Sequence, residues 1–513
     1  MKHDRLLVAA LCTFALVAAV GTSRQPNDRI SRVEQGLSQP IRIADGPVWT
    51  IDQRMKRGPV PGVGIAVVHD FKIDWAKGYG VRDVKTGAPV DEKTRFQWAS
   101  ITKAMTAVVA LRLVEKGALD LDRDVNLYLK SWKVPENEFT REEKVTLRRL
   151  LSHTAGVTVS GFRGYASGEP VPTILQSLDG VAPANNAPIR VDKKPGGDFR
   201  YSGGGYTIVQ LLVEDVSGRP LAHVARELLF EPVGMSESTI GPPASAAECR
   251  QMSMAHKQQG VAEPGHRFLV GGSACCGLWA PPSDVARFVI AIQRAFRGDP
   301  GAILSKAMLR EMLTPVSSGM GLGLSVERAG NNTFFSHSGG NPGFSSLMVG
   351  NLEKGDGFAV VANSNSNIVG EIQTSIAGAY DWPALAPVSF ASAEELELKL
   401  RRLGADTPSE LRPGNSLSEG NLNALGYALL EDGRLSDAIS VFRAVADVFP
   451  LSANACDSLA DAYAAGGDAK AAIEQYRTAL DRLARFPGPN RSYERNKAAT
   501  EEKLRKLQEK LKR

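Results

Sequence analysis

The chain has 513 residues, 43% of them hydrophobic and 23% charged, so it has enough apolar residues for a large core and for two or three domains. This composition excludes a disordered chain, a collagen and a disulfide-held miniprotein. The formal net charge is +5, and segment 490–513, with nine Lys and Arg against four Glu, carries that whole excess, so no nucleic acid partner is expected.

The first 21 residues have the pattern of a secretory signal peptide. Lys2 and Arg5 precede an apolar run over residues 6–20, and Ala19-Val20-Gly21 at its end is a small-x-small arrangement. We therefore expect cleavage after Gly21 and a secreted or periplasmic protein. An uncleaved membrane anchor is the alternative, although the run is shorter than the roughly 20 residues that span a bilayer. Residues 22–40 are polar and irregular, which predicts a linker.

Four cysteines remain after the signal peptide: Cys249, Cys275, Cys276 and Cys456. In an oxidising compartment Cys249 could form a disulfide with Cys275 or Cys276, and buried free thiols are an equal alternative. Neither the cysteines nor the seven histidines have the spacing of metal ligands, so we expect no metal and no cofactor.

Residues 41–385 form one long block of mixed strands and helices. Residues 61–68 and 73–79 read as two strands joined by a hairpin turn, and a helix is expected over 100–116, ended by Gly117. Further helices are expected over 141–152, 205–216, 220–229 and 282–296, and strands over 321–326, 334–337, 345–351 and 357–362. Because both ends of the block supply strands and helices lie between them, we expect an α+β domain whose sheet is formed by both ends.

The C-terminal part is predicted to be helical. Residues 386–417 read as a linker with a short helix, and residues 418–485 contain an internal repeat of 34 residues. The pairs are Leu425 and Leu459, Gly433 and Gly467, Ala438 and Ala472, Phe442 and Tyr476, and Val445 and Ala479. This period resembles two tetratricopeptide repeats, which would serve packing and self-association or would capture a peptide of a protein partner.

Residues 486–513 are expected to form a charged helix. Leu504, Leu507 and Leu511 give it a narrow apolar stripe at helical spacing. The stripe favours a helix that caps the repeats, and a basic helix on a membrane surface is the alternative.

Three short motifs carry the chemistry. Ser100-Ile101-Thr102-Lys103 places a hydroxyl and an amine one helical turn apart. Tyr201-Ser202-Gly203 follows a Pro-Gly-Gly turn, and His337-Ser338-Gly339-Gly340 lies at the end of a strand. A lone Ser-x-x-Lys is weak evidence, but the three elements in this order are those of a serine acyl-transferase.

With these motifs, residues 41–385 resemble the class C β-lactamase-like serine hydrolases. This group includes penicillin-binding proteins, D-alanyl-D-alanine carboxypeptidases, D-aminopeptidases and esterases. The matching stretches are residues 61–68, 96–103, 150–156, 201–202, 277–279, 283–284 and 337–343. The resemblance implies a mixed sheet flanked by helices, with an all-helical insertion and the site between them.

The resemblance also implies the roles of the site residues. Ser100 is the nucleophile, Lys103, held neutral, takes its proton, and Tyr201 acts as the second base. His337 completes the catalytic set, and the backbone N–H groups of Ser100 and Gly340 form the oxyanion hole. The residues expected to bind substrate are Ser202, Gly203, Ser338, Gly339 and Asn341. His153, in its own motif, is expected to be a structural histidine bonded to the backbone.

Two departures from the family pattern bear on the substrate. His337 stands where a lysine is frequent, and a mostly neutral imidazole attracts a carboxylate less than an ammonium does. Gly203 stands where an asparagine would contact a substrate amide. The expectation is therefore an exported serine hydrolase that forms an acyl-enzyme on an ester, a D-amino-acid peptide or a β-lactam, in that order. The alternative is a catalytically weak module that binds peptidoglycan or peptide and is coupled to the repeats.

Overall fold

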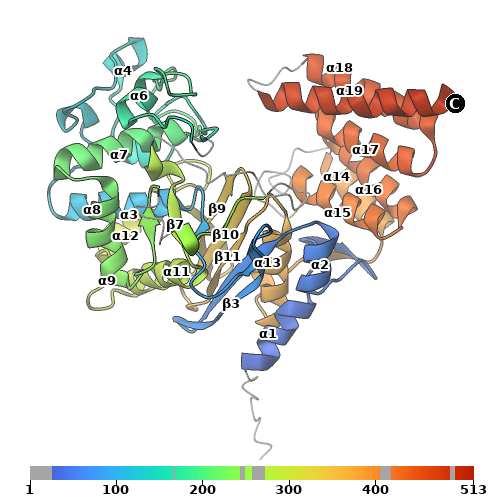
Figure 1. Cartoon of the computed structure of the whole chain (residues 1–513), viewed down its shortest axis with the longest axis horizontal. Helices are drawn as coiled ribbons and strands as arrows, with labels where there is room; N and C mark the ends of the chain where they lie inside the picture. The colour runs from blue at the N-terminus through green and yellow to red at the C-terminus, as the bar shows by residue number, and fades with distance from the viewer. Residues whose placement is uncertain are drawn as a thin grey trace, which may run out of the picture.

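The computed structural model describes residues 26–165, 168–242, 249–256, 272–404, 417–485 and 491–512. The predicted signal peptide lies outside these residues. A seven-stranded antiparallel sheet with the order β4-β3-β2-β11-β10-β9-β8 forms the centre of the larger domain (Figure 1). Its strands are β2 Gly62–His69, β3 Lys72–Asp83, β4 Ala88–Pro89, β8 Ser325–Ala329, β9 Asn332–Asn341, β10 Phe344–Asn351 and β11 Gly357–Ala362.

The sheet joins the two ends of the domain, as the sequence predicted. β2 pairs with β11, so residues near 65 lie beside residues near 360. The β2–β3 hairpin turns at Asp70 and Phe71, whose φ angles of 50° and 60° are those of a two-residue turn that follows the sheet's twist. The strand expected over 321–326 begins later, because Gly323, with φ of 85°, belongs to the preceding turn.

Helices cover both faces of this sheet. α11 Pro282–Arg297 packs against one face, while α1 Pro26–Gln35, α2 Ile51–Arg57 and α13 Ile368–Ala379 lie on the other. The expectation of a linker over 22–40 is wrong for its described part. α1 packs against α13, and Val33 and Leu37 are fully buried in the same apolar cluster as the outer face of the sheet (Figure 1).

The middle of the chain forms a helical layer beside the sheet. Eleven of the 14 residues of α3 are buried, so this helix is a core helix. The helix expected over 141–152 is two short helices, because Glu143 is extended and ends the first of them. The remaining elements are α3 Thr102–Glu115, α4 Glu138–Glu142, α5 Leu147–Leu151, α6 Ile174–Asp179, α7 Gly203–Ser217, α8 Leu221–Ala225, a π-helical turn Arg226–Phe230, α9 Glu231–Val233, α12 Lys306–Leu313 and a small sheet of β5 Phe96–Gln97, β7 Leu278–Ala280 and β6 Thr239–Ile240.

The C-terminal part is a helical region that packs against the larger domain. β1 Ile41–Ile43 pairs in parallel with β12 Val388–Phe390, and β1 shares an apolar cluster with the helices that follow. Arg57 also donates a 3.0 Å hydrogen bond to the carbonyl of Glu431. The expected linker 386–417 is therefore ordered over its described part, where β12 and α14 Ala393–Gly404 pack against neighbours.

The four helices after α14 repeat in pairs. They are α15 Glu419–Glu431, α16 Leu435–Val448, α17 Ala453–Ala465 and α18 Ala469–Arg485, and each pair starts 34 residues after the corresponding helix of the other. The periodic helical hairpins agree with the repeat in the sequence, and membership of the tetratricopeptide family stays a prediction.

The last helix, α19 Arg491–Lys512, caps the repeats. Leu504 and Leu507 pack against Ala460, Ala472 and Tyr476. Lys503 pairs with Asp457 and Asp461 on α17. Only Leu511 of the predicted stripe stays largely exposed, at 59%. Across the described ranges, the structure contains no helix whose length and apolarity suffice to cross a membrane.

Candidate active site

Ser100 lies on a tight turn between β5 and α3. Ala99 before it has a φ of 48°, which a non-glycine residue seldom adopts and which is common at functional turns. The turn is fixed by hydrogen bonds from Ile101 N–H to Trp98 O and from Thr102 N–H to Ala99 O. The regular helix begins at Thr102, two residues later than the sequence predicted, so the half-buried Ser100 precedes it.

The structure brings Lys103 and Tyr201 to this serine. The Lys103 side chain is buried, and its Nζ donates hydrogen bonds to Ser100 Oγ at 3.0 Å and to the carbonyl of Cys275 at 2.8 Å. The Tyr201 ring lies beside it, with 4.8 Å between Nζ and the ring centroid. Residues almost 100 positions apart in the sequence therefore surround one hydroxyl group.

The pKa of Lys103 depends on the charges of its neighbours. Burial alone would lower the pKa of its ammonium, but Tyr201, Cys275 and Cys276 raise it, and the net direction of the pKa is upward. This direction corresponds to a cationic Lys103 beside an ionised Tyr201 or Cys275, and the neutral lysine expected from the sequence stays a prediction. A protonated lysine cannot take the proton of Ser100, but it can orient Ser100 Oγ and stabilise negative charge near it.

Two neutral histidines border the lysine. Burial and the Lys103 charge lower the pKa of His337 to about 4, although the Ser338 carbonyl, 2.7 Å from His337 Nδ1, opposes this shift. Burial, Lys103 and His337 hold the pKa of His153 well below its ordinary value. The sequence thus predicted correctly that position 337 carries no charge at neutral pH.

The hydrogen bonds fix different tautomers for the two rings. The backbone N–H of Ser202 donates to His153 Nδ1 at 3.1 Å, so the proton of neutral His153 is on Nε2. The expectation that His153 bonds to backbone is confirmed. His337 donates from Nδ1 to a carbonyl, so its Nε2 is an acceptor. Among the described residues, both Nε2 atoms are buried without a hydrogen-bond partner.

The glycines of β9 lie against the serine turn. A Cβ on Gly339 would lie 2.4 Å from Trp98 O and from Ser346 Oγ, so only glycine allows this close approach. Gly340 has open space on its Cβ side. Asn341 pairs with Phe344 across a two-residue turn, and the pair that closes such a turn is hydrogen-bonded. Hydrogen-bonded and non-hydrogen-bonded pairs alternate along an antiparallel ladder, so Gly340 and Ser345 form a non-hydrogen-bonded pair. The N–H of Gly340 therefore points away from β10. That direction suits an oxyanion-hole donor.

Three of the residues expected to bind substrate belong to the framework instead. Ser202 Oγ caps α7 by accepting from Gly205 N–H, and it donates to the Thr158 carbonyl at 2.8 Å. Gly203 is buried against Ser160 and Phe162. Asn341 is buried and donates to Gln97 Oε1 at 2.7 Å. These contacts use the polar atoms inside the protein, which corrects the expectation. Ser338 is exposed on β9, and a role in binding stays a prediction for it.

Sequence reasoning missed the carbonyl of Cys275 as a partner of Lys103. A backbone acceptor 172 residues away leaves no signal in the sequence. The four cysteines of the described part are free thiols, which agrees with the second of the two alternatives that the sequence left open. The described residues contain no group of three or more His, Cys, Asp or Glu side chains that could hold a metal ion.

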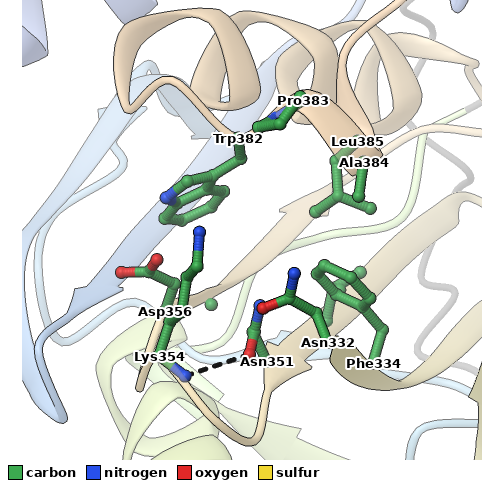
Figure 2. A pocket seen from close by; sticks show the side chains of 11 residues that line it. Asn332, Phe334, Asn351, Lys354, Asp356, Trp382, Pro383, Ala384 and Leu385 are labelled. Atoms are coloured by element: carbon green, nitrogen blue, oxygen red, sulfur yellow. Dashed lines mark hydrogen bonds between the residues drawn. The ribbon is translucent and has the colours of Figure 1, made fainter. Parts of the chain in front are cut away.

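A small cavity lies on the face of the sheet that α13 covers. Trp382, Pro383 and Leu385 cover it above β9 and β10, with Asn351, Lys354 and Asp356 at its rim (Figure 2). Its volume of about 30 Å³ is room for little more than a water molecule. It is too small for a substrate.

Comparison with known proteins places this geometry in a family. Residues 50–379 match the family model described as Beta-lactamase. The chain belongs to this family. The sequence-based resemblance is therefore confirmed for the family and for the fold.

The curated relatives cover only part of the chain. Protein flp of Staphylococcus aureus (strain N315) is 27% identical over 199 residues, which is 37% of each chain. Esterase EstB of Burkholderia gladioli is 29% identical over 194 residues, 36% of this chain and 48% of that protein. The match thus spans less than half the length of either relative.

Two solved structures share the fold. The octameric penicillin-binding protein homologue from Pyrococcus abyssi superimposes with a TM-score of 0.54 at 24% identity, over 69% of this chain and 80% of that one. D-amino acid amidase from Ochrobactrum anthropi SV3, complexed with L-phenylalanine, gives 0.55 at 22% identity, over 69% and 98%. At these identities the likeness supports the fold alone.

Proposed function

We propose that this chain is an exported serine hydrolase that cleaves an ester or amide bond through a covalent acyl-enzyme on Ser100. The observation that carries the proposal is the 3.0 Å hydrogen bond from Lys103 Nζ to Ser100 Oγ, with the Tyr201 ring beside the same ammonium. A buried cation beside a half-buried hydroxyl group stabilises the negative charge that develops on the hydroxyl oxygen during nucleophilic attack.

The protonation of Lys103 determines how the proton moves. When Ser100 Oγ attacks the substrate carbonyl carbon, its proton passes to the Tyr201 oxygen, which reacts as the phenolate beside the Lys103 ammonium. Lys103 in its cationic form has no free electron pair and cannot take this proton. Lys103 stabilises the charge on both oxygens, and the backbone N–H groups of Ser100 and Gly340 stabilise the oxyanion. Tyr201 then gives the proton to the leaving group. In deacylation, water takes the place of the leaving group and the same steps run in reverse.

The substrate ranking rests on which polar groups the pocket can offer. Gly203 has no side chain, and the Asn341 amide is bonded inside the protein, so neither supplies a side-chain amide for a substrate. Because His337 is neutral, Lys103 is the main group in the site that would attract the free carboxylate of a peptide. We therefore place a short-chain ester first, a D-amino-acid amide second and a β-lactam third. The printed names of the EstB relative and of the amidase neighbour agree with the first two classes.

The helical region is proposed to support the hydrolase domain. Its apolar cluster includes Ile41 and Ile43 of the larger domain, and α19 covers one side of its last hairpin. These contacts within the chain favour a packing role over peptide capture.

The test is hydrolysis of three probes by the purified chain: a short-chain ester, a D-amino-acid amide and a penicillin. We expect the ester to be cleaved fastest, and Ser100→Ala to lower kcat by about a thousandfold or more. Ser217→Ala, at the far end of α7, is the matched control and should behave as the unmodified chain. Equal hydrolysis by the Ser100→Ala variant would refute the proposal.

A further inference from the structure

Cys275 and Cys276 are adjacent in the sequence and are both buried beside the catalytic lysine. They are exposed by only 2% and 6%, and their Sγ atoms lie 3.1 Å apart, so the two thiols already face each other. A disulfide needs about 2.05 Å between sulfur atoms, so an approach of about 1 Å would form one. Cys249, which the sequence offered as an alternative partner, is free.

We propose that Cys275 and Cys276 are a redox modification site, in which a hydroperoxide converts the dithiol to a reversible disulfide that inactivates the Ser100 centre. The covalent part of this inference stands on the geometry of the two cysteines. Its effect on activity rests on the hydrolase function proposed above.

The environment gives the two thiols different roles. A hydrogen bond from Cys276 and the charge of Lys103 lower the pKa of Cys275 although burial opposes them, whereas the neighbouring Cys275 and burial raise the pKa of Cys276. We therefore assign the attacking role to Cys275, whose thiol has the lowered pKa, and the resolving role to Cys276.

The reaction balances in two steps. The Cys275 thiolate attacks the peroxide oxygen, the O–O bond breaks, and a sulfenic acid forms while the alkoxide leaves and takes up a proton. The Cys276 sulfur then attacks the Cys275 sulfur, so that an S–S bond replaces the S–O bond. The leaving hydroxide takes the Cys276 proton and becomes water. Two equivalents of an external thiol reverse the change by disulfide exchange.

Adjacent cysteines make a disulfide that is easily reduced. Neighbouring Cα atoms are about 3.8 Å apart across a trans peptide, closer than the roughly 4.4–6.8 Å usual for disulfides. The resulting strain makes the bond more reducible, which fits a reversible modification better than a structural bridge.

The backbone of this pair is part of the active site. The Cys275 carbonyl accepts from Lys103 Nζ at 2.8 Å, and the Cys276 carbonyl accepts from Asn341 Nδ2 at 3.3 Å. Gly277, the next residue, pairs with Ala99 before the nucleophile. Drawing the sulfur atoms together must rotate the peptide between them, and this moves the acceptor that holds Lys103. We expect at least a tenfold loss of activity on oxidation.

The experiment treats the purified chain with tert-butyl hydroperoxide and follows ester hydrolysis and the mass of tryptic peptide 268–287, which contains both cysteines and no other. We expect this peptide to lose two hydrogens as activity falls, and dithiothreitol to restore both. Cys249→Ala and Cys456→Ala should respond as the unmodified chain does, and Cys276→Ser should not lose the two hydrogens.

The outcomes separate the two proposals. The peptide mass tests the disulfide even if no substrate is hydrolysed. Should Cys276→Ser fail to fold, differential alkylation of the unmodified chain before and after oxidation gives the same answer. A cross-link of Cys249 to peptide 268–287, or an unchanged peptide after peroxide treatment, would overturn the modification site. Loss of the two hydrogens with unchanged hydrolysis would overturn the effect on activity.

Discussion

His337 makes the stability of the larger domain depend on pH in a predictable direction. Its pKa is about 4 in the folded protein against 6.5 for an unperturbed histidine, because it is buried next to the Lys103 charge. Between these values the unfolded chain binds more protons than the folded one, so stability is full above pH 6.5 and is lost as pH falls towards 4. The difference between a pKa of about 4 and one of 6.5 corresponds to about 3 kcal/mol of free energy of unfolding.

The assay compares urea unfolding of the unmodified chain with that of His337→Asn at about pH 7 and pH 5. With the two pKa values above, the His337 contribution to the free energy of unfolding falls by about 2 kcal/mol between these conditions, and His337→Asn should lack that part of the loss. Tryptophan fluorescence reports on the larger domain alone, because all six tryptophans lie at or before residue 382.

The control removes a histidine that lies on the surface. His223 is exposed on α8, so His223→Asn should keep the pH dependence of the unmodified chain. An identical loss of stability between pH 7 and pH 5 in the unmodified chain and in His337→Asn would refute the electrostatic reasoning. It would mean that burial beside Lys103 does not control the charge of this ring.

Three further variants test the site and its support. Tyr201→Phe should lower kcat for ester hydrolysis by about a hundredfold or more while the urea midpoint stays unchanged; an unchanged kcat would exclude Tyr201 as the base. Gly339→Ala should cost about 1–3 kcal/mol in urea unfolding because its Cβ meets Trp98 O, whereas Gly340→Ala should be tolerated, and equal costs would contradict the close approach of β9. Glu371→Gln should destabilise by about 3 kcal/mol or more, because the buried carboxylate holds Arg54 with two hydrogen bonds, and a cost below about 1 kcal/mol would contradict that pairing.

The sequence predicted the parts of the site that short motifs encode. Ser100 and Lys103 are one helical turn apart, and the spacing of such a pair is set by the chain itself. Tyr201 follows a Pro-Gly-Gly turn, and the β9 glycines stand just before the Pro342-Gly343 turn, so both positions are marked by Pro and Gly residues in the sequence. The sheet was predictable in the same way, because its strands at both ends of the block are continuous apolar runs.

The remaining features depend on contacts between distant segments. α1 was missed because its mainly polar sequence hides the few apolar residues, such as Val33, that pack against α13. The charge of Lys103 is hard to predict from the sequence, because the pKa of this lysine depends on Tyr201 and on two cysteines far along the chain. Ser202 and Asn341 were expected to bind substrate, and only the folded chain reveals that their polar atoms have internal partners.

The central claim is that Ser100 is the nucleophile, and intact-protein mass spectrometry after treatment with a fluorophosphonate tests it most directly. We predict a single adduct that maps to tryptic peptide 96–103, which contains Ser100, and no adduct on Ser100→Ala. An adduct that persists on Ser100→Ala, or a folded sample that takes up no reagent, would contradict the account.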